Sequence, residues 1–326
     1  MADLKIREAA PGIFVAHLPL PMKPTIVNVT LLHSDGEWAL VDTGMNTREG
    51  RQALEAAMRE VGCAPGQLRT LICTHHHADH FGMSRTIKEL TGAEVYLHAR
   101  DYDSAQHYAP GPRSDTSIAF YLRHGMPLHR YPNMQSAGDF WGALYAPVQP
   151  DHFMDDGDVI RVGRLSLEVV TTPGHTAGHC VLYLRAQRIM IVGDHLLPRI
   201  TPHVGLLPDG PPNPLGDFLA SQRKIQPFHV DLVLPAHGGV YRDHRHRSQQ
   251  IIQHHDYRLR ELLDTLRRKP RPAYDLAAEA FGFDVESPLV VQFPATFETL
   301  AHLEYLRAEG QVACEEEGGR VLYRAI

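Results

Sequence analysis

The sequence predicts an α/β protein that carries a small helical unit at its C-terminal end. Three observations support this prediction. Apolar, β-branched runs alternate with helical patterns over the first hundred residues, strand patterns return between residues 158 and 234, and the strand signal disappears after about residue 243. Such an order is typical of a mixed α/β domain joined to a second, mainly helical domain. We therefore expect domains at 1–243 and 244–326, with an error of about four residues at the boundary.

The first part of the chain alternates between strands and helices. Asp35-Gly36 is a hairpin signal between two apolar runs, and Leu54 and Ala57 belong to a pattern with helical spacing. Gly62 follows as a stop for that helix. The expected elements are strands at 13–16, 25–32, 38–41, 70–74 and 94–97 and helices at 47–61 and 84–90.

Residues 101–147 differ from their surroundings. They are rich in aromatic residues and prolines, so we expect an insertion of short helices and loops within the α/β domain. Strand patterns resume afterwards, and a proline-rich stretch from Pro198 to Pro214 precedes one more helix. The expected elements are strands at 158–162, 165–171, 180–184, 189–192 and 230–234 and a helix at 215–225.

The last part of the chain predicts helices and one hairpin. A long helix from about residue 243 ends at Arg268, because the prolines of Lys269-Pro-Arg-Pro272 cannot continue it. Two helices followed by a hairpin give the outline of a small winged-helix unit. The expected elements are helices at 273–281 and 296–309 and hairpin strands at 311–313 and 321–323.

The composition excludes several classes of protein. The 326 residues are 43% hydrophobic and 21% charged, which is ordinary for a globular chain and excludes general disorder. No run approaches the roughly 18 apolar residues that a membrane helix needs, and the start lacks the apolar segment of a secretory signal. Four cysteines without a CxxC pair argue against a disulfide framework or a cysteine zinc ribbon. We expect a cytoplasmic protein with no membrane partner.

The chain contains 22 histidines, and histidine is the commonest metal ligand. The densest group is Thr74-His-His-His-Ala-Asp-His80, directly after an apolar strand. His75 and His77 are two residues apart on an extended segment, so their side chains point the same way and can bind one ion. Asp79 and His80 follow the turn and can face a second ion. Imidazole nitrogens and carboxylate oxygens are typical zinc ligands.

Three later residues fit the same chemistry, each in a Gly- or Pro-marked turn after an apolar run. They are His175, Asp194 and His237. Alone, a histidine after a strand is usually a surface or core-edge residue, and its chance of being a ligand is about one in ten. The prediction of a metal centre depends on the conjunction, in which an HxHxDH group is followed by His, Asp and His, each at the exit of a strand.

This set of motifs resembles the metallo-β-lactamase superfamily over about residues 13–243. Asp42 in Leu-Val-Asp-Thr-Gly matches its first motif, the HxHxDH group matches the second, and His175, Asp194 and His237 match the third to fifth. The resemblance implies a four-layer αββα sandwich with a dinuclear metal site at one edge of the paired sheets. It also implies that Asp42 shapes a turn and is not a ligand.

The resemblance further implies which residues bind each ion. His75, His77 and His175 would hold the first metal, Asp79, His80 and His237 would hold the second, and Asp194 would bridge them. We expect two divalent ions, with zinc as the first choice and iron or manganese as the alternatives. Metal identity is open because persulfide dioxygenases share the HxHxDH motif with a single iron.

Such a centre would belong to a metal-dependent hydrolase. Two ions about 3.5–4 Å apart can share a bridging hydroxide as the nucleophile, and Asp79 could orient it or take its proton. Asp194 at the bridging position resembles the glyoxalase II, lactonase and ribonuclease Z branches, whereas true β-lactamases lack an aspartate bridge. The tail does not resemble the glutathione-binding helices of glyoxalase II. Residues 297–310 are instead similar to the winged-helix extension of a branch with single-strand endoribonucleases and acyl thioesterases.

Substrate contacts are expected from the insertion and from the loop at 196–216, because both follow strand ends near the metals. Aromatic residues of the insertion could form an apolar acyl pocket, although packing within the insertion is the commoner role of any one of them. Two histidines beside the motifs could contact substrate or support the ligands. The candidate substrate-contacting residues are Phe120, Tyr121, Tyr131, Trp141, His179 and His195.

The choice of substrate class depends on charge. Residues 242–271 carry nine Arg and Lys against four acids, a stripe that could attract RNA but is more often a solvated helix face. Since the whole chain carries −6, the remaining residues carry −11, so the metal-bearing domain is not basic. We therefore expect hydrolysis of a small-molecule or carrier-bound acyl thioester or ester, with cleavage of single-stranded RNA as the alternative. The sequence does not decide between a monomer and a homo-oligomer.

Overall fold

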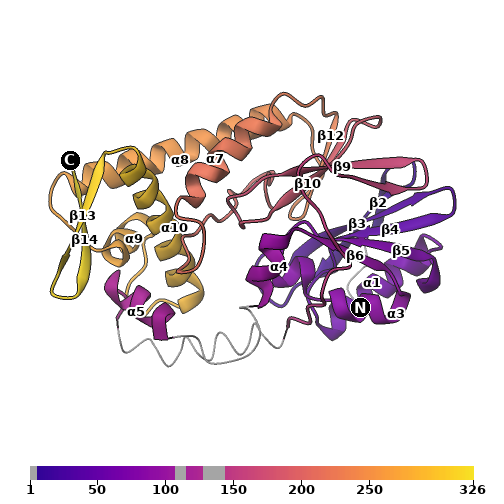
Figure 1. Ribbon diagram of the computed structural model, residues 1–326, viewed down its shortest axis with the longest axis horizontal. Coiled ribbons are helices and arrows are strands. Elements are labelled where there is room, and N and C mark those ends of the chain that lie inside the picture. Colours follow the sequence, from indigo (N-terminus) through magenta and orange to yellow (C-terminus); the bar gives the residue numbers. More distant parts are fainter. Residues whose placement is uncertain (1–5, 107–114, 128–143) are drawn as a thin grey trace.

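The computed structural model describes residues 6–106, 115–127 and 144–326, and it shows two stacked β-sheets with helices outside them (Figure 1). The first sheet has seven strands in chain order, antiparallel from β1 to β4 and parallel from β4 to β7. Its strands are β1 (Ile6–Ala10), β2 (Ile13–Pro19), β3 (Ile26–Ser34), β4 (Glu37–Val41), β5 (Leu68–Ile72), β6 (Glu94–Leu97) and β7 (His152–Phe153). The sequence does not predict β1 or β7, because β1 lies half exposed at one edge and β7 has only two residues.

The second sheet has five strands in the order β12-β11-β10-β9-β8, and only β11 and β12 pair in parallel. Its strands are β8 (Val159–Val162), β9 (Leu165–Thr171), β10 (Cys180–Leu184), β11 (Ile189–Gly193) and β12 (Leu232–Pro235). The inner faces of the two sheets form one apolar layer, which contains Ile13 and Leu32 from the first sheet and Leu167 and Leu182 from the second. This layer holds the strand ends of both sheets in a common frame.

Helices cover the outer face of each sheet. Helix α1 (Arg48–Glu60) buries Leu54 and Ala57 against the first sheet beside α3 (Ser84–Thr91), and α7 (Pro214–Ile225) buries Phe218 against the second sheet. The predicted four-layer αββα arrangement is therefore confirmed. Shorter helices lie in the connections between these elements: η1 (Pro65–Gln67), α2 (Ala78–Phe81), α4 (Ala99–Gln106) and α5 (Asp115–Arg123).

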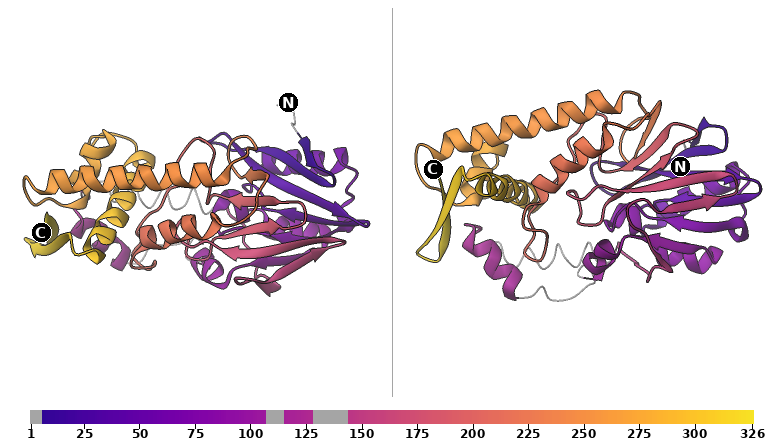
Figure 2. Two further views of the ribbon diagram at one scale, coloured as in Figure 1. Left: turned by 90° about the horizontal axis from the view of Figure 1, so that it is seen from above. Right: turned by 45° about the horizontal axis from the view of Figure 1, so that its top comes forward.

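The C-terminal residues form a helical unit at one end of the sandwich. Helix α8 runs beside α7 from the sheets toward a terminal hairpin (Figure 2). The predicted hairpin is confirmed, since β13 and β14 pair as an antiparallel two-stranded sheet, and Tyr323 of β14 also forms an antiparallel bridge with Arg271. The elements are α8 (His244–Leu266), α9 (Ala273–Phe281), α10 (Leu289–Ala308), β13 (Val312–Glu317) and β14 (Arg320–Ala325). Because α8 packs on both α7 and α10, the domain boundary at 243 stays a prediction.

Helix α10 begins at Leu289, well before the expected start at residue 296. Pro294 lies inside it, and a proline removes one backbone N–H donor from a helix, so the sequence pattern indicates a helix only beyond that point. The earlier start matters, because the first turns of α10 reach the candidate site. Within the described ranges, no helix has the length and apolar character needed to cross a membrane.

Candidate metal centre

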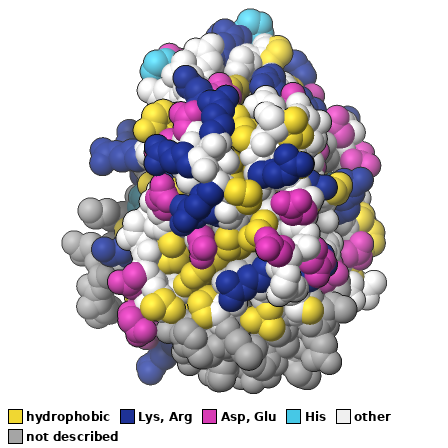
Figure 3. Space-filling model, turned by 90° about the vertical axis from the view of Figure 1, so that its left-hand side faces the viewer, with side chains coloured by type: hydrophobic (Ala, Val, Ile, Leu, Met, Phe, Trp, Pro, Cys, Tyr) yellow, Lys and Arg dark blue, Asp and Glu magenta, His cyan; other side chains and the backbone are white. Residues whose placement is uncertain are grey.

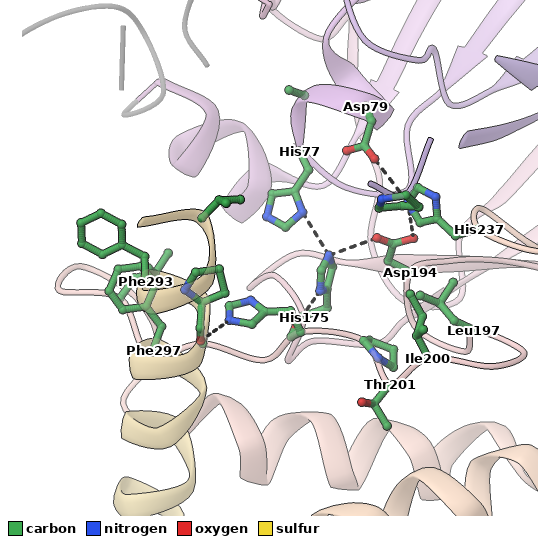
Figure 4. Close-up of a pocket in the computed structure, with 18 of the residues that line it drawn as sticks. His77, Asp79, His175, Asp194, Leu197, Ile200, Thr201, His237, Phe293 and Phe297 are labelled. Carbon is green, nitrogen blue, oxygen red and sulfur yellow. Dashed lines mark hydrogen bonds and ion pairs between the residues drawn. The ribbon is translucent and has the colours of Figure 1, made fainter. Parts of the chain in front are cut away.

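Loops from both sheets bring the predicted ligands together at one edge of the sandwich (Figure 4). The segment after β5 carries His75 and His77, and α2 then turns Asp79 and His80 inward. The other three residues lie after β9, after β11 and after β12, namely His175, Asp194 and His237.

The first group consists of His75, His77 and His175. His77 Nδ1 lies 3.1 Å from His75 Nε2 and 3.0 Å from His175 Nε2. Nitrogen ligands placed 2.0–2.1 Å from one tetrahedral zinc ion are about 3.3 Å apart. The three ring nitrogens therefore have the spacing of ligands that share one ion.

The second group consists of Asp79, His80 and His237. Asp79 Oδ2 lies 3.3 Å from His237 Nε2 and 3.7 Å from His80 Nε2. Asp194 connects the groups, because its Oδ2 lies 3.6 Å from His175 Nε2 and its Oδ1 lies 3.5 Å from His237 Nε2. Its carboxylate occupies the place of a bridge.

The residues present fit a pair of divalent ions. Among the described residues, buried His80 Nε2 and Asp194 Oδ1 have no hydrogen-bond partner, although both point into the cluster. Unpaired buried polar atoms are costly, and a metal ion would satisfy both. The imidazole and carboxylate donors are also those that zinc-type ions prefer. The cluster can thus bind metal.

Hydrogen bonds at the ring nitrogens that face away from the cluster fix the orientation of the histidines. In metal sites, this nitrogen of a ligand histidine usually bonds to a carboxylate or a carbonyl, which leaves the other nitrogen free for the metal. Three rings have such partners at Nδ1: His175 with His203 O (2.6 Å), His237 with Ile26 O (2.9 Å) and His80 with Asp42 Oδ2 (2.9 Å). The Nδ1 of His75 instead meets the hydroxyl oxygen of Thr74, at 3.1 Å.

Asp42 lies at the turn after β4 and adopts a left-handed conformation, with φ of 63°. Its Oδ1 accepts hydrogen bonds from the backbone N–H of Thr74 (2.8 Å) and from the Thr74 hydroxyl (3.0 Å). Because its other oxygen meets His80, Asp42 links the turn to both ends of the HxHxDH segment. It supports the ligands and lies outside the candidate ligand groups, as the resemblance implied.

The sequence profile of the Metallo-beta-lactamase superfamily matches residues 22–237. The chain belongs to the metallo-β-lactamase superfamily. A solved structure of a superfamily member from Thermus thermophilus is 33% identical, with a TM-score of 0.85 over 98% of this chain and 100% of that one. The Bacillus subtilis protein named probable metallo-hydrolase YqjP is 24% identical over 96% of this chain and 98% of its own length. An atrochrysone carboxyl ACP thioesterase from Emericella nidulans is 24% identical over 90% of this chain and 78% of its own.

The prediction of a metal-dependent hydrolase with this superfamily's fold is thereby confirmed.

The two groups of candidate ligands differ in their electrostatics. Burial lowers the pKa of His75 and His77 well below the usual value, and neighbouring histidines add to this effect. Burial also opposes charge on His80 and His237, but adjacent carboxylates outweigh it, so the pKa of His80 is well above its usual value and that of His237 rises to about 9. A dication can replace protons in this second group.

Asp101 is a buried acid beside the candidate ligands that the sequence did not reveal. It is fully buried on α4, where Oδ2 accepts hydrogen bonds from the N–H of His76 and the hydroxyl of Thr176, both at 2.8 Å. Its Oδ1 accepts from the N–H of Gly178 at 2.6 Å. Asp101 therefore ties the loop of His75 to the loop that carries the third histidine of the first group. An acidic residue early in a helix gives no sequence signal for such a role.

The structure does not bring His179 or His195 to the pocket. His179 is buried behind Asp194, and its Nε2 accepts a hydrogen bond from the Asp194 N–H at 3.2 Å. Its Nδ1 meets the hydroxyl of Thr172 at 2.8 Å, so His179 connects the loop of Asp194 to the end of β9. His195 is fully buried with its ring 5.4 Å from that of Phe218. Both lie behind the ligands rather than on the substrate side.

A cavity of about 540 Å³ opens beside the ligands. Its walls come from the predicted loop at 196–216 and, unexpectedly, from the start of α10, which contributes Phe293 and Phe297 (Figure 4). Phe120 and Tyr121 of the insertion do not line it. They pack instead against the C-terminal unit, and the Tyr121 ring stacks on Phe297 with centroids 5.2 Å apart.

Phe120 and Tyr121 therefore do not form an aromatic wall of this cavity. Aromatic composition indicates an apolar contact but not its partner, and here the partner is the buried side of α10. The other two aromatic candidates, Tyr131 and Trp141, lie outside the described residues.

Proposed function

We propose that this protein hydrolyses an acyl thioester or ester at a dinuclear metal centre. One observation carries the proposal. The cluster of ligand-type side chains lies at one end of a cavity of about 540 Å³ whose other end is apolar. A carbonyl group at the cluster would place its acyl group in the apolar part.

In this proposal the ligands divide as the geometry groups them: His75, His77 and His175 for one ion, Asp79, His80 and His237 for the other, and Asp194 between them. When bound, two divalent ions lower the pKa of water toward neutrality and polarise a carbonyl oxygen, so hydrolysis needs no serine or cysteine nucleophile. We propose zinc, because imidazole and carboxylate are its usual ligands.

Asp79 is the residue that we propose as catalytic. It lines the cavity, and its side chain is 20% exposed, compared with 12% for Asp194 and 0% for His80. Asp79 is thus the most accessible acid of the centre. A carboxylate at this place can orient the attacking water and accept its proton, provided that the water lies within hydrogen-bond reach.

The charged groups of α8 favour this function over cleavage of RNA. A nuclease for single strands needs a positive groove with stacking aromatics. The arginines of α8 and its C-terminal continuation mostly bond within the protein: Arg245 with Gln226 O and Phe228 O, Arg247 with Leu197 O and Ile200 O, Arg258 with Glu261, Arg267 with Asp264, and Arg271 with Glu279. On the outer face of the C-terminal unit, Lys and Arg alternate with Asp and Glu (Figure 3).

The thioesterase relative supports the same choice, because its similarity extends over 90% of this chain and so includes the C-terminal unit. We therefore propose a small-molecule or carrier-bound acyl compound as the substrate. Cleavage of single-stranded RNA is the alternative function.

The proposal is tested by parallel assays of the zinc-loaded protein on acyl thioesters, lactones and single-stranded RNA, with chelator-stripped protein as the control. We expect turnover of a thioester or ester that disappears on stripping and returns with zinc. Salt-sensitive, metal-dependent cleavage of RNA without turnover of any acyl compound would overturn the proposal.

A further inference from the structure

We infer that the substrate's acyl group is an apolar chain or ring and that helix α10 selects it. The inference rests on the proposed function and adds the class of acyl group and the segment that binds it. Three features support it: the chemistry of the cavity wall, the hydrogen bonds that tie this wall to a candidate metal ligand, and the exposure of apolar side chains at its rim.

The wall at the end of the cavity far from the metal cluster is apolar. Helix α10 contributes Leu289, Val290, Phe293 and Phe297 there, whereas Leu197 and Ile200, from the loop after Asp194, extend the apolar lining toward the metal cluster (Figure 4). The rings of Phe293 and Phe297 lie 5.7 Å apart in a stacked arrangement, extended by Tyr121 behind them. Aromatic rings held in this way present a large, stiff apolar surface to a ligand.

The leaving group of a thioester or ester does not suit this wall. Common leaving groups such as coenzyme A or glutathione carry phosphates or carboxylates, which need cations or other donors. Among the described residues that line the cavity, none is Lys or Arg. An apolar acyl group requires no such partner, and burying it is favourable in proportion to its area. The acyl side of the carbonyl therefore belongs against α10, with the leaving group toward the solvent.

The apolar wall is held at a fixed place relative to the metal cluster. His203 accepts a hydrogen bond from His175 Nδ1 on its backbone oxygen (2.6 Å), and its own Nε2–H donates to Pro294 O (2.9 Å). The backbone N–H of Leu206 donates to Phe297 O at 3.0 Å. These bonds connect α10 to a candidate ligand through one loop. The distance between the reacting carbonyl and the aromatic wall is therefore set by the protein, which is the condition for selecting acyl groups by length.

The loop and the helix also approach each other closely at Gly205. A Cβ at this position would lie 3.0 Å from the Cβ of Phe297 and 2.7 Å from the ring of His203. The close approach leaves little space for a side chain between the loop and the helix, so the loop packs directly against the wall.

The rim of the cavity offers a matched pair of positions for a test. Val290 is 67% exposed and lines the cavity, whereas its neighbour Val291 is 44% exposed and does not. Both lie in the first turn of α10, so the same substitution at each has a similar effect on folding. An aspartate introduced at position 290 would weaken the binding of an apolar acyl group, because its carboxylate would have to be desolvated. An aspartate at position 291 would not contact the acyl group.

The experiment measures kcat/KM of the zinc-loaded full-length protein for acetyl, butyryl, hexanoyl and octanoyl thioesters that share one leaving group. We expect kcat/KM to rise about three- to fourfold for each added methylene until the cavity is full. The Val290→Asp variant should lower the ratio of octanoyl to acetyl kcat/KM by about tenfold or more, while Val291→Asp keeps the wild-type ratio. Phe293→Leu serves as a milder second variant, which should flatten the rise.

A binding measurement separates failure of this inference from failure of the proposed function. Acetate, butyrate, hexanoate and octanoate are titrated calorimetrically into the zinc-loaded wild type and into both valine variants. Affinity that rises with length and falls in Val290→Asp alone, without turnover of any thioester or ester, would overturn the proposed function and support the apolar site. Turnover and binding that are independent of acyl length would overturn the inference and leave hydrolysis standing.

Discussion

The two ends of the cavity are built in different ways. The metal end consists of side chains that lie in short segments next to strands of both sheets, where the shared apolar layer fixes their positions. The apolar end consists of a loop and the start of α10, which lie far apart in the chain and meet through a few hydrogen bonds. The sandwich thus positions the candidate metal ligands, whereas in the proposed function selection of the acyl group depends on the docking of the C-terminal unit. Changes at the metal end should therefore stop the reaction for every substrate, and changes at the apolar end should alter which substrate reacts.

The largest effect is expected from Asp194→Ala. The carboxylate lies between the two ligand groups, so its removal should lower the zinc content of both sites. We expect kcat/KM to fall by more than about 100-fold, equally for short and long acyl groups, because loss of even a supporting group costs 10–100-fold. Elemental analysis and thioester assays measure the two effects.

The matched control is Asp209→Ala, which removes an exposed acid of the neighbouring loop outside the cavity. It should retain the zinc content and the activity of the wild type. If Asp194→Ala kept two zinc ions and full activity, the bridging role would be wrong.

A smaller loss is expected from Asp101→Asn. An asparagine keeps the shape of the side chain but cannot accept all three hydrogen bonds that Asp101 accepts from the two ligand loops. We expect zinc affinity to fall by about 10–100-fold, with the fold retained. Asp103→Asn, an exposed substitution on the same helix, should leave zinc affinity unchanged. Equal affinities of both variants in a competition titration would show that Asp101 does not position the ligands.

The metal end could be predicted from the sequence because its information is local. Each ligand lies within a few residues of an apolar strand, so the motif and the element that positions it are read together. His75 and Asp194 could be assigned in this way, and the structure groups them as expected, whereas the role of Asp42 followed from the family resemblance. Asp101 could not be found, because its partners His76 and Gly178 are distant in the sequence and only the fold brings them together.

The apolar end could not be predicted for the same reason. The aromatic content of the insertion indicated a pocket wall, but Phe120 and Tyr121 stand behind the wall that α10 forms. The start of α10 could not be predicted either, because Pro294 interrupts the helical sequence pattern between Phe293 and Phe297, which line the cavity. Tertiary packing decides which of the two aromatic segments lines the cavity, and residue composition does not contain that information.

Arg247→Met should weaken selection without removing the metals. The Arg247 guanidinium donates to Leu197 O at 2.6 Å and to Ile200 O at 2.9 Å, and so holds one wall of the cavity. Methionine keeps much of the apolar stem but loses both bonds, and hydrogen bonds from charged groups contribute about 1.5–3 kcal/mol. We expect kcat/KM for octanoyl thioester to fall about tenfold, with a smaller change for the acetyl thioester and an unchanged zinc content.

Arg260→Met is the matched control, because Arg260 of the same helix is exposed and, among the described residues, donates only to Asp256 O within the helix. It should keep the wild-type ratio of long to short acyl groups. A loss of zinc in Arg247→Met would contradict the separation of the two ends.

The smallest effect concerns the stability of the helix that forms the wall. Burial raises the pKa of Glu298 on α10 to about 7, although Arg258 partly opposes the shift. A carboxyl group with a raised pKa in the folded state costs stability where it is ionised. This cost is therefore present above about pH 7 and disappears as the pH falls toward the ordinary value near 4.5. Glu298→Gln should remove it and stabilise the protein at pH 8 by about 1–2 kcal/mol, less than the full shift implies because the side chain is half-buried.

Melting temperatures at pH 8 and pH 5 measure this difference, and the gain should be several-fold smaller at pH 5 than at pH 8. Glu309→Gln makes the same chemical change at the exposed end of α10 and should shift stability by less than about 0.5 kcal/mol at either pH. Since Glu298 does not line the cavity, the activity of Glu298→Gln toward acetyl thioester should match the wild type. A gain of equal size at both pH values would mean that ionisation of Glu298 is not its cause, and that packing between α8 and α10 controls the stability of the wall instead.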